Sequence, residues 1–354
     1  MYDGIRGDRM KLAFFDYKEY DKISFDKVNN DKYDITYFNV LLNKDTAILA
    51  KGFDAVCAFV NDKIDKEVLD KLNEYNIHVL VLRCAGYNNV DVKAAYKKVH
   101  ILTVPGYAPE AIAEHAFALI NSLTRHIHKA YNRVRDFNFS LNGLTGFNLS
   151  GKTIGVIGTG KIGKVMINIA NGYGMRVLAY DLFPNQSLNC TYVSLDELYK
   201  ESDIITLHAP LTSDNYHLIN SDAISKMKDG VMIINTSRGG LIDSHALFDG
   251  LKSKKIGAAG LDVYEEESDV FFIDKSLEGI NDDILSLLIS MPNVIVTSHQ
   301  AYLTTEALEE IAKVTIDNLD KGLNDDYSPN EVCYMCKNKN DLKACLKIRK
   351  KSCW

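Results

Sequence analysis

The sequence predicts an α/β protein that holds two doubly wound, mainly parallel sheets. Its 354 residues exceed what one hydrophobic core usually organises, so two domains of roughly 150 residues each are expected. Short apolar runs alternate with segments of helical period almost from end to end, which is the pattern of repeated βαβ units. Many of these runs are apolar on both faces, and this is typical of buried parallel strands.

Four strands are expected in the first third of the chain, each ending in polar residues or glycine. They are predicted at 11–16, 55–60, 79–82 and 101–104. A long connecting helix is then expected from Pro109, because apolar residues from Ile112 to Leu123 recur at helical spacing and proline suits a first helical turn.

A second series of six strands follows, with helical segments between most of them. These strands are predicted at 153–158, 176–180, 203–207, 231–235, 256–261 and 294–297. After residue 300 one amphipathic segment remains, with Leu308, Ile311 and Leu319 on one stripe. It is too short to form a domain, so it must pack against the first series.

Composition and charge favour a small-molecule ligand. Lys and Arg number 41 against 47 Asp and Glu, and the net charge of −6 does not favour nucleic acid or an anionic membrane surface. No apolar stretch approaches the ~18 residues that span a bilayer, and the first nine residues are polar, so a cytoplasmic location is expected. The seven cysteines are odd in number and scattered, which suits reduced thiols.

The sequence Gly158-Thr159-Gly160-Lys161-Ile162-Gly163 follows a predicted strand and opens a predicted helix. This is the context that a dinucleotide-binding turn requires. Gly158 permits the tight turn, Gly160 lets backbone amides approach a pyrophosphate, and Gly163 lets the helix pack on its strand. The next strand ends at Asp181, whose carboxylate can bind a ribose 2′-hydroxyl and would repel a 2′-phosphate. NAD is therefore predicted rather than NADP.

Several further motifs occur in a fixed order along the chain. They are Arg83-Cys84-Ala85-Gly86-Tyr87-Asn88-Asn89-Val90-Asp91, Glu110-Ala111-Ile112-Ala113-Glu114-His115, Asn138 to Gly146, Asn235-Thr236-Ser237-Arg238-Gly239, Asp262-Val263-Tyr264-Glu265-Glu266-Glu267 and Ser298-His299-Gln300-Ala301-Tyr302. With these motifs the chain resembles the D-isomer-specific 2-hydroxyacid dehydrogenases, and most closely the fermentative D-lactate dehydrogenases, from about Met10 to about Val332.

The resemblance marks Arg238, Glu267 and His299 as catalytic, and their chemistry agrees. Arg238 and His299 each follow a predicted strand, and such strand ends face the ligand crevice of an open α/β sheet. A guanidinium can bind a 2-oxo acid carboxylate bidentately, and an imidazole can donate a proton near neutral pH. A carboxylate could orient that imidazole, but Glu265 and Glu266 are equally acidic neighbours of Glu267, and the residues alone leave the choice open.

The resemblance also implies residues that contact the cofactor and the substrate. The further cofactor positions are Lys161, Ile162, Ala209, Pro210, Asn215, Thr236 and Asp262, the last facing the nicotinamide carboxamide. The implied substrate positions are Cys84, Ala85, Gly86, Tyr107 and Tyr302. For the two tyrosines, ordinary core packing is an equally good interpretation.

The last residues, 333–354, form a tail rich in Cys and Lys. Cys333, Cys336, Cys345 and Cys353 could supply four zinc thiolates, but the last two lack the paired spacing of a zinc ribbon. No cluster with metal-ligand spacing stands elsewhere in the sequence. We therefore expect no metal and a disordered extension.

Together these features predict a Rossmann NAD-binding domain, 108–299, inserted into a flavodoxin-like substrate domain made of 10–107 and 300–332. The resemblance implies the reversible reduction of pyruvate to D-lactate by NADH, in a homodimer or higher homo-oligomer that is expected in the cytoplasm. Two alternatives stay open. One is a dehydrogenase for larger 2-oxo acids, and the other is a non-enzymatic corepressor built on the same fold.

Overall fold

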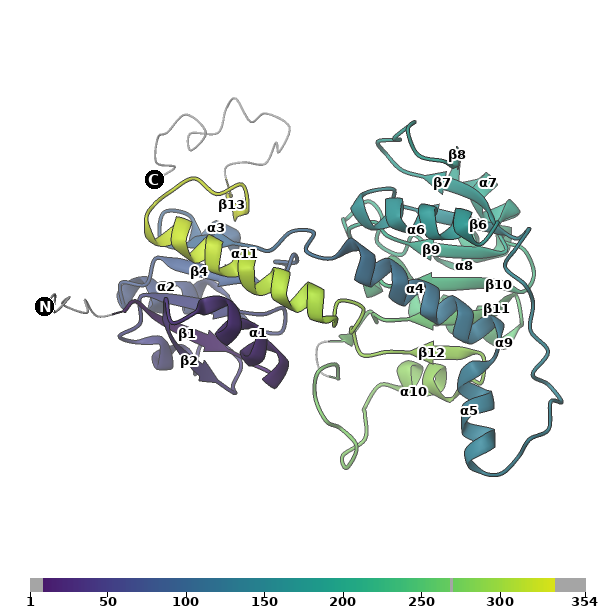
Figure 1. The fold of residues 1–354 in the computed structure, drawn as a ribbon, viewed down its shortest axis with the longest axis horizontal. Helices are drawn as coiled ribbons and strands as arrows, with labels where there is room; N and C mark the ends of the chain where they lie inside the picture. Colours follow the sequence, from purple (N-terminus) through teal and green to yellow (C-terminus); the bar gives the residue numbers. More distant parts are fainter. Residues whose placement is uncertain (1–8, 268–269, 335–354) are drawn as a thin grey trace, which may run out of the picture. The chain divides into compact units, whose positions relative to one another are not determined.

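The computed structural model describes residues 9–267 and 270–334, which form two compact units (Figure 1). One unit holds the described residues up to Tyr107 and from Thr304 onward, and the other holds Ala108–Leu303. Each unit is built on one sheet flanked by helices, and all but one of the strand pairs are parallel. The predicted fold class is confirmed. Among the described helices, none is long and apolar enough to cross a membrane.

The sheet of the first unit has the strand order β13-β5-β4-β3-β1-β2. Its strands are β1 (Lys11–Phe15), β2 (Asp34–Phe38), β3 (Ala55–Ala58), β4 (Val79–Leu82), β5 (His100–Leu102) and β13 (Glu331–Val332). The four predicted strands are present, and β2 and β13 were not predicted. β2 lies at the sheet edge with its residues exposed or half-buried, so it lacks the continuous apolar run of a central strand. The two-residue β13 pairs antiparallel with β5.

The helices of this unit are α1 (Glu19–Asn29), α2 (Lys66–Glu74), α3 (Val92–Ala95) and α11 (Thr305–Leu323), with a 3₁₀ turn η1 (Ala47–Ala50). Figure 1 shows α11 running alongside α1 and β4. Its buried stripe includes Ala307, Ile311 and Leu319. Asn318 also donates a hydrogen bond to the carbonyl of Thr103, at 2.8 Å, just beyond β5. The predicted C-terminal amphipathic helix is therefore part of the first unit.

A buried arginine joins several elements of the first unit. Arg83 directly follows β4 and is almost fully buried. Its guanidinium donates to Asp21 of α1 at 3.2 Å and to the carbonyls of Phe15 and Asp16 at 3.1 and 2.5 Å. The rings of Phe14 and Phe59 lie on it at 4.7 and 4.4 Å. Arg83 thus ties the carboxyl ends of β1 and β4 to α1.

The sheet of the second unit is parallel throughout, in the order β12-β11-β10-β9-β6-β7-β8. Its strands are β6 (Thr153–Ile157), β7 (Arg176–Tyr180), β8 (Thr191–Tyr192), β9 (Ile204–Leu207), β10 (Val231–Asn235), β11 (Ile256–Leu261) and β12 (Val294–Val296). The six predicted strands are present, and the two-residue β8 adds an edge. The chain order reverses between β6 and β9, and ligands bind at such a switch point in open α/β sheets.

Helices cover both faces of this second sheet. The helices of this unit are α4 (Pro109–Thr124), α5 (Ile127–Arg135), α6 (Lys161–Gly172), α7 (Leu195–Glu201), α8 (Ser221–Lys226), α9 (Ser244–Lys252) and α10 (Asp283–Ser290), with a 3₁₀ turn η2 (Gly239–Leu241), and α5 buries no residue. The buried residues of α4 and α6 form one core with the sheet, and those of α7 to α10 form another on the opposite face. This two-sided burial explains why the central strands read as continuous apolar runs.

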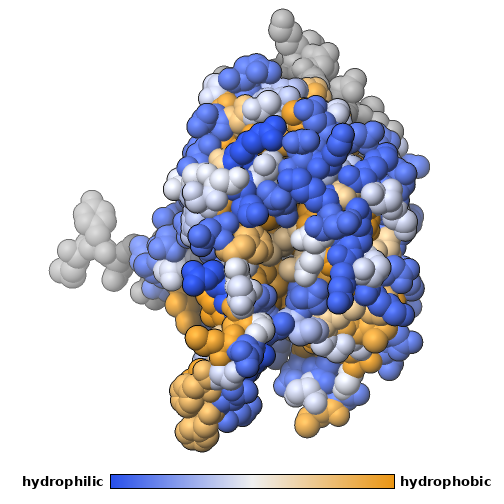
Figure 2. Space-filling view, turned by 90° about the vertical axis from the view of Figure 1, so that its right-hand side faces the viewer, coloured by the Kyte–Doolittle hydropathy of each residue, from blue (hydrophilic) through white to orange (hydrophobic). Residues whose placement is uncertain are grey.

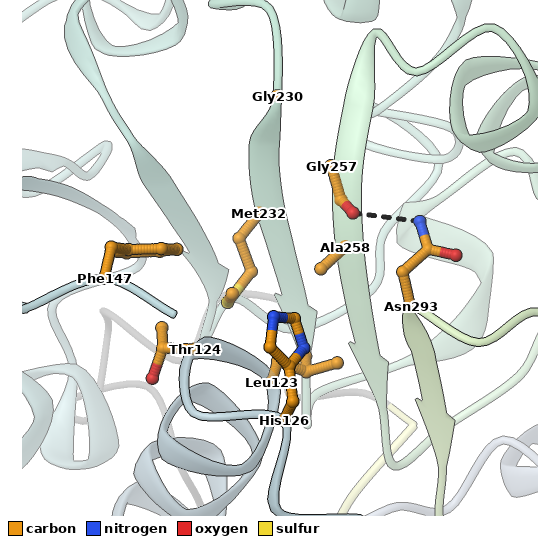
Figure 3. Close-up of a pocket in the computed structure, with 9 residues that line it drawn as sticks. All are labelled: Leu123, Thr124, His126, Phe147, Gly230, Met232, Gly257, Ala258 and Asn293. Atoms are coloured by element: carbon orange, nitrogen blue, oxygen red, sulfur yellow. Dashed lines mark hydrogen bonds between the residues drawn. The ribbon is translucent and has the colours of Figure 1, made fainter. Parts of the chain in front are cut away.

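A small pocket of about 130 Å³ lies at the edge of this sheet where β10 and β11 begin (Figure 3). Thr124 and His126 at the end of α4 line it together with Phe147 and Met232. Asn293 closes one side, where its side-chain amide donates to the Gly257 carbonyl at 2.9 Å. The pocket lies at the amino ends of these strands, whereas ligands of open α/β sheets bind at the carboxyl ends. It is therefore at the opposite edge of the sheet from the predicted site.

Candidate active site

The glycine-rich turn joins β6 to α6 with the geometry that its glycines require. Gly158 has a φ of 93°, and a Cβ there would lie 2.6 Å from the carbonyl carbon of His208. A Cβ on Gly163 would lie 2.0 Å from the oxygen of Gly158, so this glycine allows α6 to pack against the turn. A Cβ on Gly160, the N-cap of α6, would instead meet no heavy atom within 4 Å. The helix N-terminus therefore has open space beside it, as binding of a pyrophosphate requires.

Asp181 directly follows β7 and is held against this turn. One of its oxygens accepts from the backbone N–H and the hydroxyl of Thr159, at 2.6 and 3.1 Å, and the other accepts from the N–H of Phe183 at 2.8 Å. The carboxylate is thus fixed beside the N-terminus of α6. These residues fit a dinucleotide, with the turn for its pyrophosphate and Asp181 for a ribose hydroxyl.

The other cofactor residues predicted from the resemblance lie near the carboxyl ends of the same strands. Lys161 and Ile162 begin α6, and Ala209 and Pro210 follow β9. The side chain of Asn215 accepts from the N–H of Thr212 at 2.7 Å and donates to the Pro210 carbonyl at 2.8 Å, which closes that loop. Thr236 follows β10, and its buried hydroxyl has no hydrogen-bond partner among the described residues. A bound cofactor could supply that partner.

Asp262 follows β11 and is fully buried. Its carboxylate accepts from the hydroxyl of Thr297 at 2.5 Å and from the N–H groups of Gln300 and Ala301 at 2.9 and 2.8 Å. Burial alone would raise the pKa of Asp262, but hydrogen bonds from His115, Thr297 and the backbone outweigh burial and lower the pKa. Asp262 therefore holds the segment after β12 as an ionised group.

His299 and Glu267 form a hydrogen-bonded dyad in the second unit. The Nδ1 atom of His299 lies 3.0 Å from a carboxylate oxygen of Glu267, and both side chains are partly exposed. Because the carboxylate is the acceptor, Nδ1 carries the proton of this contact and Nε2 remains for another partner. The second oxygen of Glu267 accepts from the N–H of Tyr264 at 3.2 Å, and the ring of Phe272 lies 5.8 Å from the imidazole ring.

Glu265 is engaged in a different cluster. It accepts from the hydroxyl of Tyr216 and from Nε2 of His217, both at 2.6 Å, and from the hydroxyl of Ser244 at 3.2 Å. Burial alone would raise the pKa of Glu265, but the hydrogen bonds from Tyr216 and His217 outweigh burial and lower the pKa. Of the two glutamates that flank Glu266, Glu267 is therefore the one that contacts His299.

Arg238 lies just beyond β10 and is half-buried. Its guanidinium donates to the carbonyl of Ser237 at 2.6 Å, and no carboxylate of the described chain forms an ion pair with it. Its own carbonyl accepts from the side chain of Asn235 at 2.9 Å, which fixes the turn. Gly239 allows that turn to pack on the backbone of Tyr264, since a Cβ would lie 2.0 Å from its carbonyl carbon.

The residues predicted to bind the substrate are divided between the two units. Cys84, Ala85 and Gly86 follow Arg83 in the first unit, where the Cys84 thiol donates to the Gly86 carbonyl at 3.3 Å. Tyr107 also belongs to the first unit, whereas Tyr302 is buried in the second. Their contact with substrate stays a prediction.

Several residues of this region were not assigned a role from the sequence. Tyr216, His217 and Ser244 hold Glu265, Phe272 lies beside His299, and His115 and Thr297 contact Asp262. His115 stands in one of the quoted motifs, which was the only signal for it. The remaining residues lie far in the sequence from the groups that they contact, and no sequence motif links each residue to its partner.

No group of three or more His, Cys, Asp or Glu side chains in the described chain is arranged to hold a metal ion. The predicted disordered tail and its zinc alternative concern Cys336, Cys345 and Cys353, which lie outside the described residues. Cys333 is described and forms no disulfide with a described cysteine.

Comparison with known proteins identifies the family. The model of the D-isomer specific 2-hydroxyacid dehydrogenase NAD-binding domain matches residues 117–301. The chain belongs to this family. It is 52% identical over 317 residues to a 2-hydroxyacid dehydrogenase homolog of Haemophilus influenzae, covering 88% of this chain and 96% of that one. It is 50% identical over 328 residues to the D-lactate dehydrogenase of Escherichia coli, covering 91% of this chain and 100% of that one.

The fold agrees with a solved family structure. The apo-structure of D-lactate dehydrogenase from Escherichia coli superposes with a TM-score of 0.84 at 48% identity, covering 91% of this chain and 100% of that chain. The present chain is therefore an NAD-dependent oxidoreductase of this family. The predicted family, cofactor and enzymatic activity are confirmed, and the corepressor alternative is set aside.

Proposed function

We propose that this dehydrogenase reduces pyruvate to D-lactate with NADH, reversibly. Arg238 binds the substrate carboxylate, His299 donates the proton, and Glu267 orients His299. The observation that carries the proposal is the half-buried guanidinium of Arg238, which has no carboxylate partner in the described chain and stands at the carboxyl end of β10. A 2-oxo acid offers such a partner. The Escherichia coli relative is named a D-lactate dehydrogenase, and D-lactate is the reduction product of pyruvate, which supports pyruvate within that class.

The chemistry then divides among three side chains. The planar guanidinium can bind the carboxylate bidentately and polarise the neighbouring carbonyl. Bound NADH supplies the hydride that C2 accepts. The carbonyl oxygen gains negative charge in that step and takes a proton from Nε2 of His299, while Glu267 accepts the hydrogen bond from Nδ1 and fixes the ring. The reverse reaction uses the same groups.

A turnover assay tests the proposal. NADH oxidation by the purified protein is measured with pyruvate, phenylpyruvate and 2-oxoisocaproate, and the product of pyruvate is assigned by chiral chromatography. The highest kcat/KM with pyruvate and a D-lactate product are expected. A clear preference for phenylpyruvate or 2-oxoisocaproate would instead favour the alternative of a dehydrogenase for larger 2-oxo acids.

Glu267→Gln is expected to move the pH profile of pyruvate reduction toward lower pH, because the neutral amide no longer places a negative charge beside the imidazole that donates the proton. Glu265→Gln, which alters the cluster with Tyr216 and His217, is the matched control and is expected to leave the profile in place. The measurement is kcat/KM against pH for the three proteins. A shift in Glu265→Gln alone would assign the orienting role to Glu265.

A strong preference for NADH over NADPH is expected from Asp181, because the 2′-phosphate of NADPH would approach a carboxylate fixed by Thr159 and Phe183. Asp181→Ala should narrow the gap in kcat/KM between the two cofactors. Both cofactors are compared at saturating pyruvate in wild type and variant. Equal efficiency of NADH and NADPH in the wild type would contradict this role of Asp181.

We also propose that the protein is a homodimer or higher homo-oligomer through the arm formed by α5 and the segment after it. Large apolar side chains of this arm are exposed, among them Tyr131 at 61%, Phe137 at 85%, Phe139 at 69% and Leu141 at 80%. Figure 2 views the side on which the arm lies and shows hydrophobic residues among the hydrophilic ones of this face. An apolar surface of this kind is typical of a protein–protein interface.

The oligomer proposal is tested by replacing two arm residues, Phe139→Asp and Leu141→Asp, in one variant. Sedimentation velocity should show an oligomer for the wild type and a smaller species for the variant. Ile23→Asp, at an exposed apolar residue of α1, is the control and should keep the wild-type mass. A monomeric wild type would refute the proposal.

A further inference from the structure

The turn that presents His299 adopts a backbone conformation that needs outside support. His299 follows β12 with a φ of 55°, in the left-handed region, which is unfavourable for a residue with a side chain. Within the turn, the N–H of His299 bonds the carbonyl of Thr297 at 3.1 Å. The N–H of Thr297 in turn bonds the Leu261 carbonyl of β11 at 2.8 Å. The position of the His299 imidazole therefore depends on how firmly this turn is held.

Asp262 supplies part of that support from the end of β11. Its two oxygens accept the N–H groups of Gln300 and Ala301, the two residues after His299, and the hydroxyl of Thr297, two residues before it. The carboxylate thus brackets His299 on both sides. Because the Asp262 carboxylate is fully buried, the loss of any one of these hydrogen-bond donors would destabilise the folded protein.

His115 of α4 completes the arrangement. Its Nε2 atom lies 3.1 Å from the hydroxyl oxygen of Thr297 and 3.4 Å from a carboxylate oxygen of Asp262. Thr297 gives its own proton to Asp262, so its oxygen accepts from His115, and Nε2 of His115 must carry a proton. The hydrogen bonds therefore run from α4 through Thr297 and Asp262 to the turn of His299.

We infer that His115 is a positioning residue of the reaction, which acts through Thr297 and Asp262 to hold the turn that carries the proton donor. The inference rests on the proposed role of His299. It requires a donor at Nε2 of residue 115, and an apolar ring of similar size would fill the same space without holding the turn.

The experiment compares three variants of the full chain. His115→Phe keeps the ring volume and removes the donor, His115→Gln keeps an N–H donor at a similar reach, and Thr297→Val removes the linking hydroxyl. His245→Phe, at an exposed histidine of α9, is the matched control. For each protein we would measure kcat, KM for the 2-oxo acid, the pH profile, the affinity for NADH by fluorescence, and the melting temperature.

His115→Phe is expected to lower kcat about tenfold or more, since a displacement of about 1 Å at a reacting group can cost about a hundredfold. Its pH profile should move toward lower pH, because the contact between His299 and Glu267 loosens. KM and NADH affinity should change little. His115→Gln should recover most of kcat, Thr297→Val should reproduce the slow phenotype, and the double variant His115→Phe/Thr297→Val should be no slower than either single variant.

Three results would overturn the inference. They are a wild-type kcat and pH profile in His115→Phe, an equal loss in His115→Gln, or additive losses in the double variant. If His115→Phe fails to fold, Thr297→Val alone decides, because a wild-type kcat and pH profile in that variant would also overturn it. The substrate is whichever 2-oxo acid the wild type reduces best, so a failure with pyruvate refutes the proposed substrate and leaves this test intact.

Discussion

Replacing Arg238 with glutamine is expected to remove most of the turnover of pyruvate. The amide cannot supply the charged, planar pair of donors to the substrate carboxylate and carbonyl. Loss of such a group typically removes about 3 kcal/mol or more of transition-state stabilisation, which is a fall in kcat/KM of roughly a hundredfold or more. Both kcat and KM should suffer, because the guanidinium contacts substrate in the ground state and in the transition state.

The control for this prediction is Arg176→Gln, at an exposed arginine of the same unit that pairs with Glu201 at 3.3 Å. It should retain the wild-type kcat/KM. NADH binding, followed by fluorescence, should be unchanged in both variants, which separates a substrate defect from a cofactor defect. Near-normal kcat/KM in Arg238→Gln would remove Arg238 from the mechanism.

Much of the fold follows from the sequence because the central strands are buried on both faces. β6, β9 and β10 lie between two layers of helices, so each forms an apolar run that stands out in the sequence. β2 at the sheet edge has exposed or half-buried residues throughout, and no such run marks it. β8 and β13 have two residues each and depend on tertiary pairing.

From the sequence, the residues of the proposed site could be predicted only where they follow a predicted strand. The resemblance marked Arg238 and His299. Both follow strands, β10 and β12, whose carboxyl ends are where ligands bind in open α/β sheets, and this position supported the prediction. The choice of glutamate could not be made this way, since Glu265 and Glu267 differ in the residues they contact and not in type. His217 and Tyr216, distant in sequence, engage Glu265 and leave Glu267 as the partner of His299.

Arg83 shows the same limit for a buried charge, because nothing in its sequence neighbourhood distinguishes a solvated arginine from an enclosed one. Arg83→Met is expected to destabilise the first unit by about 3–5 kcal/mol. Methionine fills much of the space between Phe14 and Phe59, but it leaves Asp21 without its counter-ion and two buried carbonyls without donors. The measurement is urea unfolding followed by a probe within this unit, since the two units need not unfold together.

The pH dependence of this loss gives a second, independent check. Burial already raises the pKa of Asp21 even with Arg83 beside it, and removal of the guanidinium should raise that pKa further. A carboxyl group whose pKa is higher in the folded state than in the unfolded state binds more protons when folded, so its effect on stability becomes more favourable as the pH falls. The gap in stability between wild type and Arg83→Met should therefore narrow below neutral pH. Arg9→Met, which removes an exposed ion pair with Asp31 in the same unit, should cost less than about 1 kcal/mol at every pH. If Arg83→Met behaved like Arg9→Met, the buried guanidinium would not be what joins β1, β4 and α1.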